Sequence, residues 1–185
     1  MLKSKHPDQA LALVDPIITK AMLKEAKDPA AICPGAAVAL FQGLLGGNFS
    51  VSVENDWCDA MLVKGYALSE LKRPEEAEQV LKALVRHDPN NPNYLIEYAY
   101  TVRVNGGLTH SLDLYKQAER IASRFSDKAS GPHWRAAALR GQGFALTDLQ
   151  RWDDAKKAYE RSFKYEPVNE IAQHELQYIE QHRHN

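Results

Sequence analysis

The sequence predicts an all-α protein, an α-solenoid built from stacked antiparallel helix hairpins. Two observations lead to this prediction. The stretch GYALSELKRPEEA, which starts at Gly65, returns later in the chain as GFALTDLQRWDDA, which starts at Gly143. In both copies the same intervals separate a glycine, a leucine, an alanine, a large apolar residue and a proline, and such a repeat indicates a recurring structural unit.

A third, degenerate copy lies between these two and begins at Ala99. Residues of the expected sizes come after Ala99 at the same intervals; they are Val102, Ser111, Tyr115 and Ala118. The interval from Ala99 to Gly143 is ten residues longer than the interval from Gly65 to Ala99. We expect the additional residues in a loop, SDKASGPHWR, over residues 126–135.

Each copy has the features of two helices that pack closely. A small residue in the first helix and another in the second allow antiparallel helices to approach, while larger residues fill the groove between them. The expected pairs are Gly65 with Ala77, Ala99 with Ser111, and Gly143 with Ala155. A hairpin of this kind cannot bury its apolar face alone, so we expect the copies to stack.

The two ends of the chain predict further helices. An apolar face from Pro7 to Lys27 and an apolar stretch from Pro34 to Leu45 predict a divergent N-terminal hairpin. Residues 46–56 predict a linker, and the polar C-terminus predicts a helix that caps the array. The whole chain is expected to be one domain over residues 1–185. Its expected parts are the N-terminal helices and linker (1–57), the three copies (58–91, 92–135 and 136–169) and the cap (170–185).

The spacing of the small residues, leucine, aromatic residue and proline resembles the tetratricopeptide repeat, in the form of a small bacterial-type protein. The resemblance covers residues 58–167. Met61 and Leu139 stand where the family usually has an aromatic residue, and any large apolar side chain can fill that site. The resemblance implies a right-handed α-solenoid whose first helices line a concave groove.

The resemblance also implies that the residue after each small residue of the first helix points into this groove. Tyr66, Tyr100 and Phe144 occupy the position, so all three copies place an aromatic ring there. Aromatic and arginine side chains contribute much of the energy of protein interfaces. The pattern therefore predicts a site for an extended or helical peptide with apolar anchors and an acidic group. The candidate partner-binding residues are Leu62, Tyr66, Ile96, Tyr100, Arg103, Arg140 and Phe144.

Two interpretations of the aromatic residues remain open. They either receive a partner, or they pack against neighbouring hairpins or the N-terminal helix, because soluble proteins avoid an open apolar groove. Docking of chaperone C-termini is not expected. The carboxylate clamp that the family uses for it consists of Lys, Asn and Arg, and the matching positions here are Leu62, Tyr66, Glu97, Ala137 and Gly141.

The sequence thus predicts a non-catalytic protein-protein interaction module, a scaffold or adaptor. The alternative is a dedicated chaperone or immunity-type protein for one specific, secreted partner. A third interpretation, an enzyme or ligand-binding protein, rests on His133, Trp134 and Arg135 in the predicted loop, without an orienting acid in the sequence pattern. Nucleotide-binding and hydrolase motifs are absent from the sequence, so we expect no cofactor. We expect no metal site either, since the one histidine cluster, His182 and His184, lies in the tail.

Composition limits the compartment and the partner. The 23 basic and 24 acidic residues give a net charge of −1, so no overall field attracts nucleic acid or an anionic membrane. The longest apolar run, residues 36–45, is too short for membrane insertion. The N-terminus does not resemble a signal peptide, which predicts a cytoplasmic protein, or a periplasmic one if a signal peptide was removed. Cys33 and Cys58 predict buried, reduced thiols; the alternative is a disulfide and an oxidising compartment.

Overall fold

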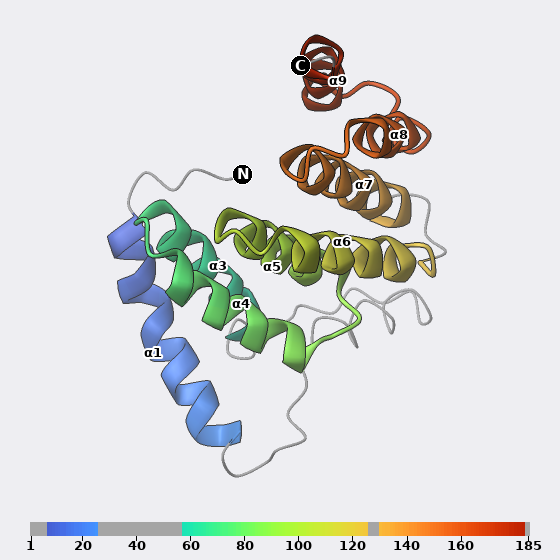
Figure 1. The fold of residues 1–185 in the computed structure, drawn as a ribbon. Coiled ribbons are helices and arrows are strands. Elements are labelled where there is room, and N and C mark those ends of the chain that lie inside the picture. The colour runs from blue at the N-terminus through green and yellow to red at the C-terminus, as the bar shows by residue number, and fades with distance from the viewer. Residues whose placement is uncertain (1–6, 26–56, 126–129, 184–185) are drawn as a thin grey trace. The chain divides into compact units, whose positions relative to one another are not determined.

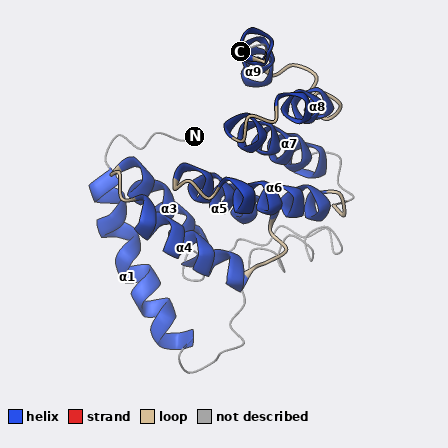
Figure 2. Ribbon diagram, in the orientation of Figure 1, coloured by secondary structure: helices blue, strands red, loops and turns tan. Residues whose placement is uncertain are grey.

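The structure is a computed structural model that describes residues 7–25, 57–125 and 130–183. Every regular element in these ranges is an α-helix, as Figure 2 shows. The all-α prediction and the stacked hairpins are therefore confirmed. Contacts divide the chain into two compact units, residues Met1–Asn90 and Asn91–Asn185.

Unit 1 consists of α1 (Pro7–Glu25), α3 (Trp57–Glu70) and α4 (Pro74–His87) (Figure 1). Helix α3 packs against both α1 and α4, and the α3–α4 hairpin is the first copy of the repeat. Helix α1 turns Val14 and Ile18 inward, where both are buried. An ion pair between Asp15 and Lys64, 2.7 Å long, also joins α1 to α3.

Unit 2 consists of α5 (Pro92–Val104), α6 (Leu108–Ala122), α7 (Ser130–Asp148), α8 (Trp152–Ser162) and α9 (Glu170–His182). Helices α5 and α6 form one hairpin and α7 and α8 the next, and α6 packs on α7 (Figure 1). The first helices of the two hairpins, α5 and α7, also touch each other. This last contact positions the candidate site, because the predicted residues of unit 2 lie on these two helices.

The small residues of the hairpins lie against larger ones. A Cβ atom placed on Gly65 would come within 2.7 Å of Leu81, and one on Gly143 within 2.5 Å of the Tyr159 ring. The nearest neighbour of each glycine is thus the large residue sixteen positions later. In the middle copy the predicted pair meets directly, since the Ser111 hydroxyl donates to the Ala99 carbonyl at 2.8 Å.

The three hairpin turns share one backbone feature. Lys72, Gly106 and Gln150 have φ angles of 57°, 86° and 57°, in the left-handed region. The intervals between them are the same as those that separate Gly65, Ala99 and Gly143. After each, a backbone N–H closes the turn on a carbonyl of the preceding helix: Arg73 on Leu68, Gly107 on Val102, and Arg151 on Leu146. The repeat therefore extends to the conformation of its turns.

Helix α9 closes unit 2. Asn169 caps its start by accepting a hydrogen bond from the Ala172 N–H at 3.0 Å. The helix packs on α8 and buries Ala172 and Ile179. Gln177 lies as far after Gly143 as Ala99 lies after Gly65, so it stands where a further copy would have its small residue, and it is exposed and polar. This polar position is what a capping helix requires.

One predicted element is wrong. The loop expected over residues 126–135 is wrong from Ser130 onward, because α7 begins there and contains His133, Trp134 and Arg135. Residues 126–129 lie outside the described residues. Pro132 lies in the first turn, where a missing N–H costs nothing, and the alanines that follow favour helix. The predicted helix over residues 34–45 and the linker over residues 46–56 lie outside the described residues.

The cysteines do not follow the favoured prediction either. Cys58 is buried and disulfide-bonded, whereas we expected a reduced thiol. Sequence spacing could not decide this, because pairing depends on which segments the fold brings together. Cys33, the other cysteine of the chain, lies outside the described residues. None of the described helices is long and apolar enough to cross a membrane.

Candidate functional site

The candidate site in unit 2 is built by two neighbouring helices. Tyr100 and Arg103 lie about one turn apart near the end of α5. Arg140 and Phe144 lie one turn apart on α7, which packs beside α5. The residues that precede the two rings, Ala99 and Gly143, are buried in the hairpin seams, so the rings are placed at the edge of the packed surface.

Arg103 connects the two helices. Its guanidinium carbon lies 5.7 Å from the centre of the Tyr100 ring and 5.3 Å from that of Phe144, within the range of cation–π attraction. Its Nη1 atom donates to Oδ2 of Asp148 at 2.6 Å. The structure therefore brings together three of the predicted residues, and the arginine is held by two rings and one carboxylate.

Phe144 rests on a rigid support. Its ring meets the Tyr159 ring edge to face, with 5.7 Å between the centroids. Tyr159 is fully buried beneath Gly143, and burial raises the pKa of its hydroxyl. The buried Tyr159 ring therefore supports Phe144 where it projects from α7.

Arg140 is anchored separately. It forms an ion pair with Glu166, in the segment after α8, and Glu166 also accepts a hydrogen bond from the Asn169 side chain at 3.2 Å. Earlier on α7, the Arg135 guanidinium lies 4.3 Å from the centre of the Tyr165 ring. Both arginines of the predicted site are thus paired with acids of the chain itself, which the sequence analysis did not foresee.

The seven predicted residues share an intermediate exposure. Ile96 lies one turn before Tyr100 on α5 and is partly exposed, as are Tyr100, Arg103, Arg140 and Phe144. Leu62 and Tyr66 are also partly exposed, one turn apart on α3 in unit 1. The structure thus assembles five of the seven residues on α5 and α7, and the other two form their own pair on α3.

Besides Glu166, two contributors to the site were missed by sequence reasoning. Asp148 completes the cluster around Arg103, and Tyr115 of α6 lies under Gly141 of α7, with its ring in the place of a side chain at that glycine. Burial raises the pKa of the Tyr115 hydroxyl as it does for Tyr159. The available signal was Gly141, a second glycine two positions before Gly143, which indicates a second close approach on the same helix.

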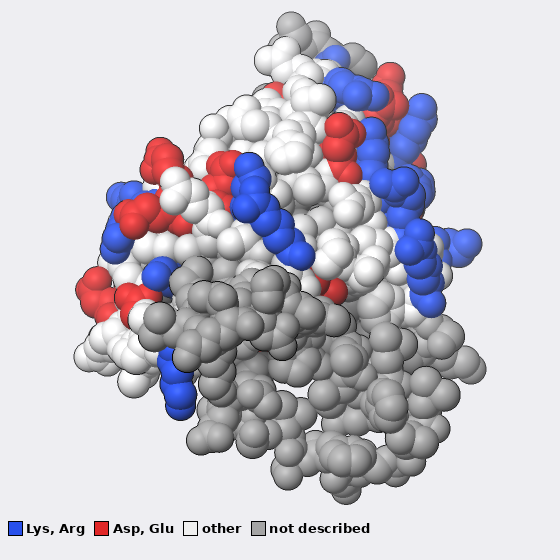
Figure 3. All heavy atoms as spheres, turned by 90° about the horizontal axis from the view of Figure 1, so that it is seen from below, with Lys and Arg blue, Asp and Glu red and all other residues white. Residues whose placement is uncertain are grey.

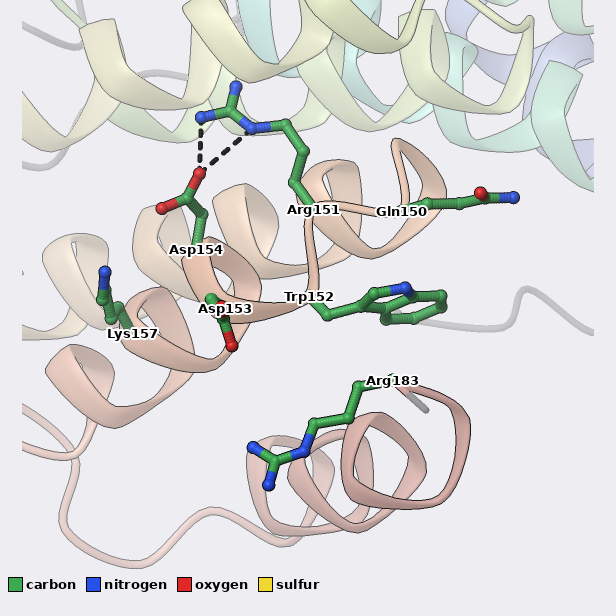
Figure 4. A pocket seen from close by; sticks show the side chains of 7 residues that line it. All are labelled: Gln150, Arg151, Trp152, Asp153, Asp154, Lys157 and Arg183. Atoms are coloured by element: carbon green, nitrogen blue, oxygen red, sulfur yellow. Dashed lines mark hydrogen bonds and ion pairs between the residues drawn. The ribbon is translucent and has the colours of Figure 1, made fainter. Parts of the chain in front are cut away.

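A separate pocket of about 620 Å³ opens at the start of α8 (Figure 4). It is lined by Gln150, Arg151, Trp152, Asp153, Asp154, Lys157 and Arg183. Arg151 donates to Asp154 at 2.6 Å, and this hydrogen bond lowers the pKa of the Asp154 carboxyl. The lining holds no histidine, cysteine or serine.

The enzyme interpretation rests on His133, Trp134 and Arg135, and these residues lie on α7. His133 meets Trp134 edge to face at 4.7 Å between centroids, on α7, and neither residue lines the pocket at α8. In the part of the chain that the structure describes, no group of three histidine, cysteine, aspartate or glutamate side chains could hold a metal ion.

Comparison with known proteins agrees with the repeat. Residues 59–101 match the family model of the tetratricopeptide repeat. Among curated proteins, none matches the chain closely enough to count as a relative. The match begins in α3 and ends in α5, so it covers the first copy and the start of the second.

Several solved structures have a similar fold. The first tetratricopeptide-repeat domain of Spaghetti (RPAP3), bound to the HSP90 peptide SRMEEVD, is 23% identical, covers 69% of this chain and 94% of its own, and gives a TM-score of 0.58. The tetratricopeptide-repeat domain of Arabidopsis OM64 is 18% identical, with coverages of 68% and 95% and a TM-score of 0.57. YrrB, a tetratricopeptide-repeat protein with an unusual peptide-binding site, is 18% identical, with coverages of 89% and 71% and a TM-score of 0.56.

Proposed function

We propose that the chain is a tetratricopeptide-repeat protein and that it is a non-catalytic interaction module, which binds a peptide or segment of a partner protein. The binding surface is the aromatic face of α5 and α7, which we define as Ile96, Tyr100, Arg103, Arg140 and Phe144. The observation that carries the proposal is the cluster of Arg103 between the Tyr100 and Phe144 rings. Rigid aromatic and arginine side chains that are partly exposed are typical anchors of protein interfaces.

The pairing of the arginines supports a proposal for the chemistry of the partner. Asp148 and Glu166 already neutralise Arg103 and Arg140, so the aromatic face has little net positive charge. An acidic partner group would have to displace one of these carboxylates. The face therefore suits apolar or aromatic anchors rather than the acidic group that the sequence pattern suggested.

The same reasoning separates this chain from a chaperone-binding domain. The Spaghetti domain is bound to an HSP90 peptide that ends in Glu-Glu-Val-Asp, a strongly acidic ligand. The positions that match the carboxylate clamp here are Leu62, Tyr66, Glu97, Ala137 and Gly141, and none is basic. We therefore propose a different ligand, one without an acidic C-terminus.

The experiment is a pull-down with mass spectrometry, followed by affinity measurement on the captured partner. The double variant Tyr100→Ala with Arg103→Ala should lose at least about tenfold in affinity, as expected when two anchor residues are removed. The matched control, Thr109→Ala with Arg120→Ala, changes exposed residues of α6 and should bind normally. If the double variant instead lowers the melting temperature by many degrees, the residues belong to the core and the proposal is wrong.

We also propose that the protein functions in an oxidising compartment. The support is the disulfide at Cys58, since such bonds persist mainly outside the reducing cytosol. This favours the alternative of a dedicated chaperone or immunity-type protein with a secreted partner over a general cytoplasmic adaptor. Alkylation of the protein isolated from its native cells, carried out in denaturant and without reductant so that a buried thiol could react, should leave Cys58 unmodified. Full alkylation would show a reduced thiol and contradict the compartment; the aromatic face is judged by the affinity measurement alone.

A further inference from the structure

The exposed sides of α6 and α8 carry a cluster of basic side chains. Two of them lie on α6 and a third just after its end, at intervals of four residues; two more lie on α8 and one just after its end. We call this cluster the α6–α8 basic face; it consists of Lys116, Arg120, Arg124, Lys157, Arg161 and Lys164, all of them exposed. Figure 3 shows several Lys and Arg side chains on the right of that view, with Asp and Glu side chains among them.

The two rows are held side by side by a carboxylate that is only slightly exposed. Glu119 of α6 accepts a hydrogen bond from Arg161 of α8 at 2.5 Å and another from Gln142 of α7 at 2.8 Å. Gln142 is buried, so this network ties the three helices together from below the surface. The spacing of the α6–α8 basic face is therefore set by the fold of unit 2.

Part of the positive charge is not compensated. Five acidic residues stand among or beside the six basic ones. They are Asp113, which lies 3.7 Å from Lys116, Glu119, which binds Arg161, Glu160, and Asp153 and Asp154, which lie about one turn before Lys157 on α8. The four remaining cations form no ion pair within the described part of the chain; they are Arg120, Arg124, Lys157 and Lys164. A local excess of positive charge therefore exists on a chain whose net charge is −1.

An apolar side chain stands at the edge of this face. Phe125 directly follows Arg124 and the end of α6, and its exposed fraction is 41%. Basic clusters of four to eight residues attract anionic lipids, and stable attachment needs a second, apolar contact. The α6–α8 basic face supplies the basic cluster, and Phe125 supplies the apolar contact.

We propose that the α6–α8 basic face docks unit 2 on an anionic membrane surface, with Phe125 inserted between the headgroups. The basic side chains would contact lipid phosphates without any helix crossing the bilayer. This surface lies on the second helices of the hairpins, whereas the aromatic face lies on the first helices, α5 and α7. The protein could then hold a partner segment while it is attached to a membrane, and either property can fail without the other.

The test is co-sedimentation with vesicles. The wild-type protein should bind vesicles of phosphatidylcholine with about 30% phosphatidylglycerol, should not bind pure phosphatidylcholine, and should be released at about 0.5 M salt. The variant Arg120→Glu with Lys157→Glu should weaken binding at least about tenfold, because each basic residue near the surface contributes to attachment. Phe125→Ser should weaken it about threefold or more, since the apolar contact is lost.

The matched control is Lys20→Glu with Lys82→Glu, which changes the net charge equally on exposed sites of α1 and α4. Its binding should stay within about twofold of the wild type, since membrane attraction falls off over about one Debye length. Equal loss in both double variants would show that only total charge matters, and the proposal would be wrong. Equal binding to neutral vesicles, or binding to soluble poly-glutamate with no binding to vesicles, would also overturn it; the latter would identify an acidic protein as the partner.

Discussion

Tyr159 fills the space that a side chain on Gly143 would need. A Cβ atom on Gly143 would come within 2.5 Å of Cζ of the Tyr159 ring, which is fully buried. The same ring supports Phe144 through an edge-to-face contact at 5.7 Å. One tyrosine therefore sets the distance between α7 and α8 and also positions an aromatic residue of the candidate site.

Gly143→Ala should destabilise the protein by about 1–3 kcal/mol, because an added methyl group overpacks the seam between α7 and α8. Urea unfolding followed by circular dichroism measures the loss. Tyr159→Leu removes the ring atoms that cause the overlap, so the double variant should lose less than the sum of the two single variants. Additive losses would mean that Gly143 is required for a reason other than the ring.

Gln150→Gly and Lys72→Gly should each stabilise the protein by up to about 1 kcal/mol, because both residues have left-handed φ angles of 57°, which cost a non-glycine residue energy. The equivalent turn of the middle copy already has Gly106. The gain is limited because glycine adds entropy to the unfolded chain. Thermal melting measures it. Gln79→Gly, in the interior of α4 and exposed, is the control and should lower stability by about 1 kcal/mol.

The repeat could be predicted because close packing leaves a direct trace in the sequence. Gly65 and Gly143 must be small, and their spacing shows two copies of one hairpin. The middle copy has Ala99 instead, and its Tyr115 lies under Gly141 of the next hairpin, a contact that the internal comparison of copies could not show. The ten additional residues of the middle copy predict an inserted loop, whereas Pro132 and the alanines after it favour a helix. The start of α7 at Ser130 therefore does not follow from the repeat.

The candidate site could be predicted only in part, for a related reason. The positions of Tyr100 and Phe144 follow from the repeat, since each ring is next to a seam residue. The acids that neutralise the arginines do not: Asp148 is 45 residues from Arg103, and Glu166 is 26 residues from Arg140. The α6–α8 basic face could not be predicted from the net charge of the chain, which is near zero. Folding brings together on one surface basic residues that are far apart in the sequence.

Asp148→Asn should change the ligand preference of the aromatic face more than its stability. The ion pair with Arg103 is partly exposed at both ends, so its loss should cost less than about 1 kcal/mol of unfolding free energy. The freed guanidinium, still held between Tyr100 and Phe144, should then bind an acidic peptide such as SRMEEVD more tightly than the wild type does. Fluorescence anisotropy with a labelled peptide measures this gain.

The control for this experiment is the double variant Asp148→Asn with Arg103→Gln, which removes the guanidinium as well. It should bind the acidic peptide no better than the wild type. A loss of stability in Asp148→Asn well above what a partly exposed ion pair contributes, or no gain in peptide binding, would give the ion pair a structural role. It would then not control access to Arg103.

Alkaline pH should unfold the protein through two buried tyrosines. Burial raises the pKa of the Tyr115 and Tyr159 hydroxyls above the value of about 10 that tyrosine has in an unfolded chain. Above that pH the unfolded state releases protons that the native state keeps, so stability is intact below about pH 10 and falls as the pH rises further. Each buried tyrosine can remove up to about 1.4 kcal/mol per pH unit in this range.

The measurement is a series of urea unfolding curves between about pH 8 and 11, with tyrosinate absorbance recorded in parallel, since ionisation of the buried tyrosines should coincide with unfolding. Tyr115→Phe and Tyr159→Phe should each reduce the slope of stability against pH, because phenylalanine does not titrate. Tyr178→Phe, at an exposed position on α9, should leave the slope unchanged. If neither variant reduces the slope of stability against pH, both hydroxyls ionise in the folded protein. Tyr159 would then be accessible to solvent, which would contradict its buried packing against Gly143 and Phe144.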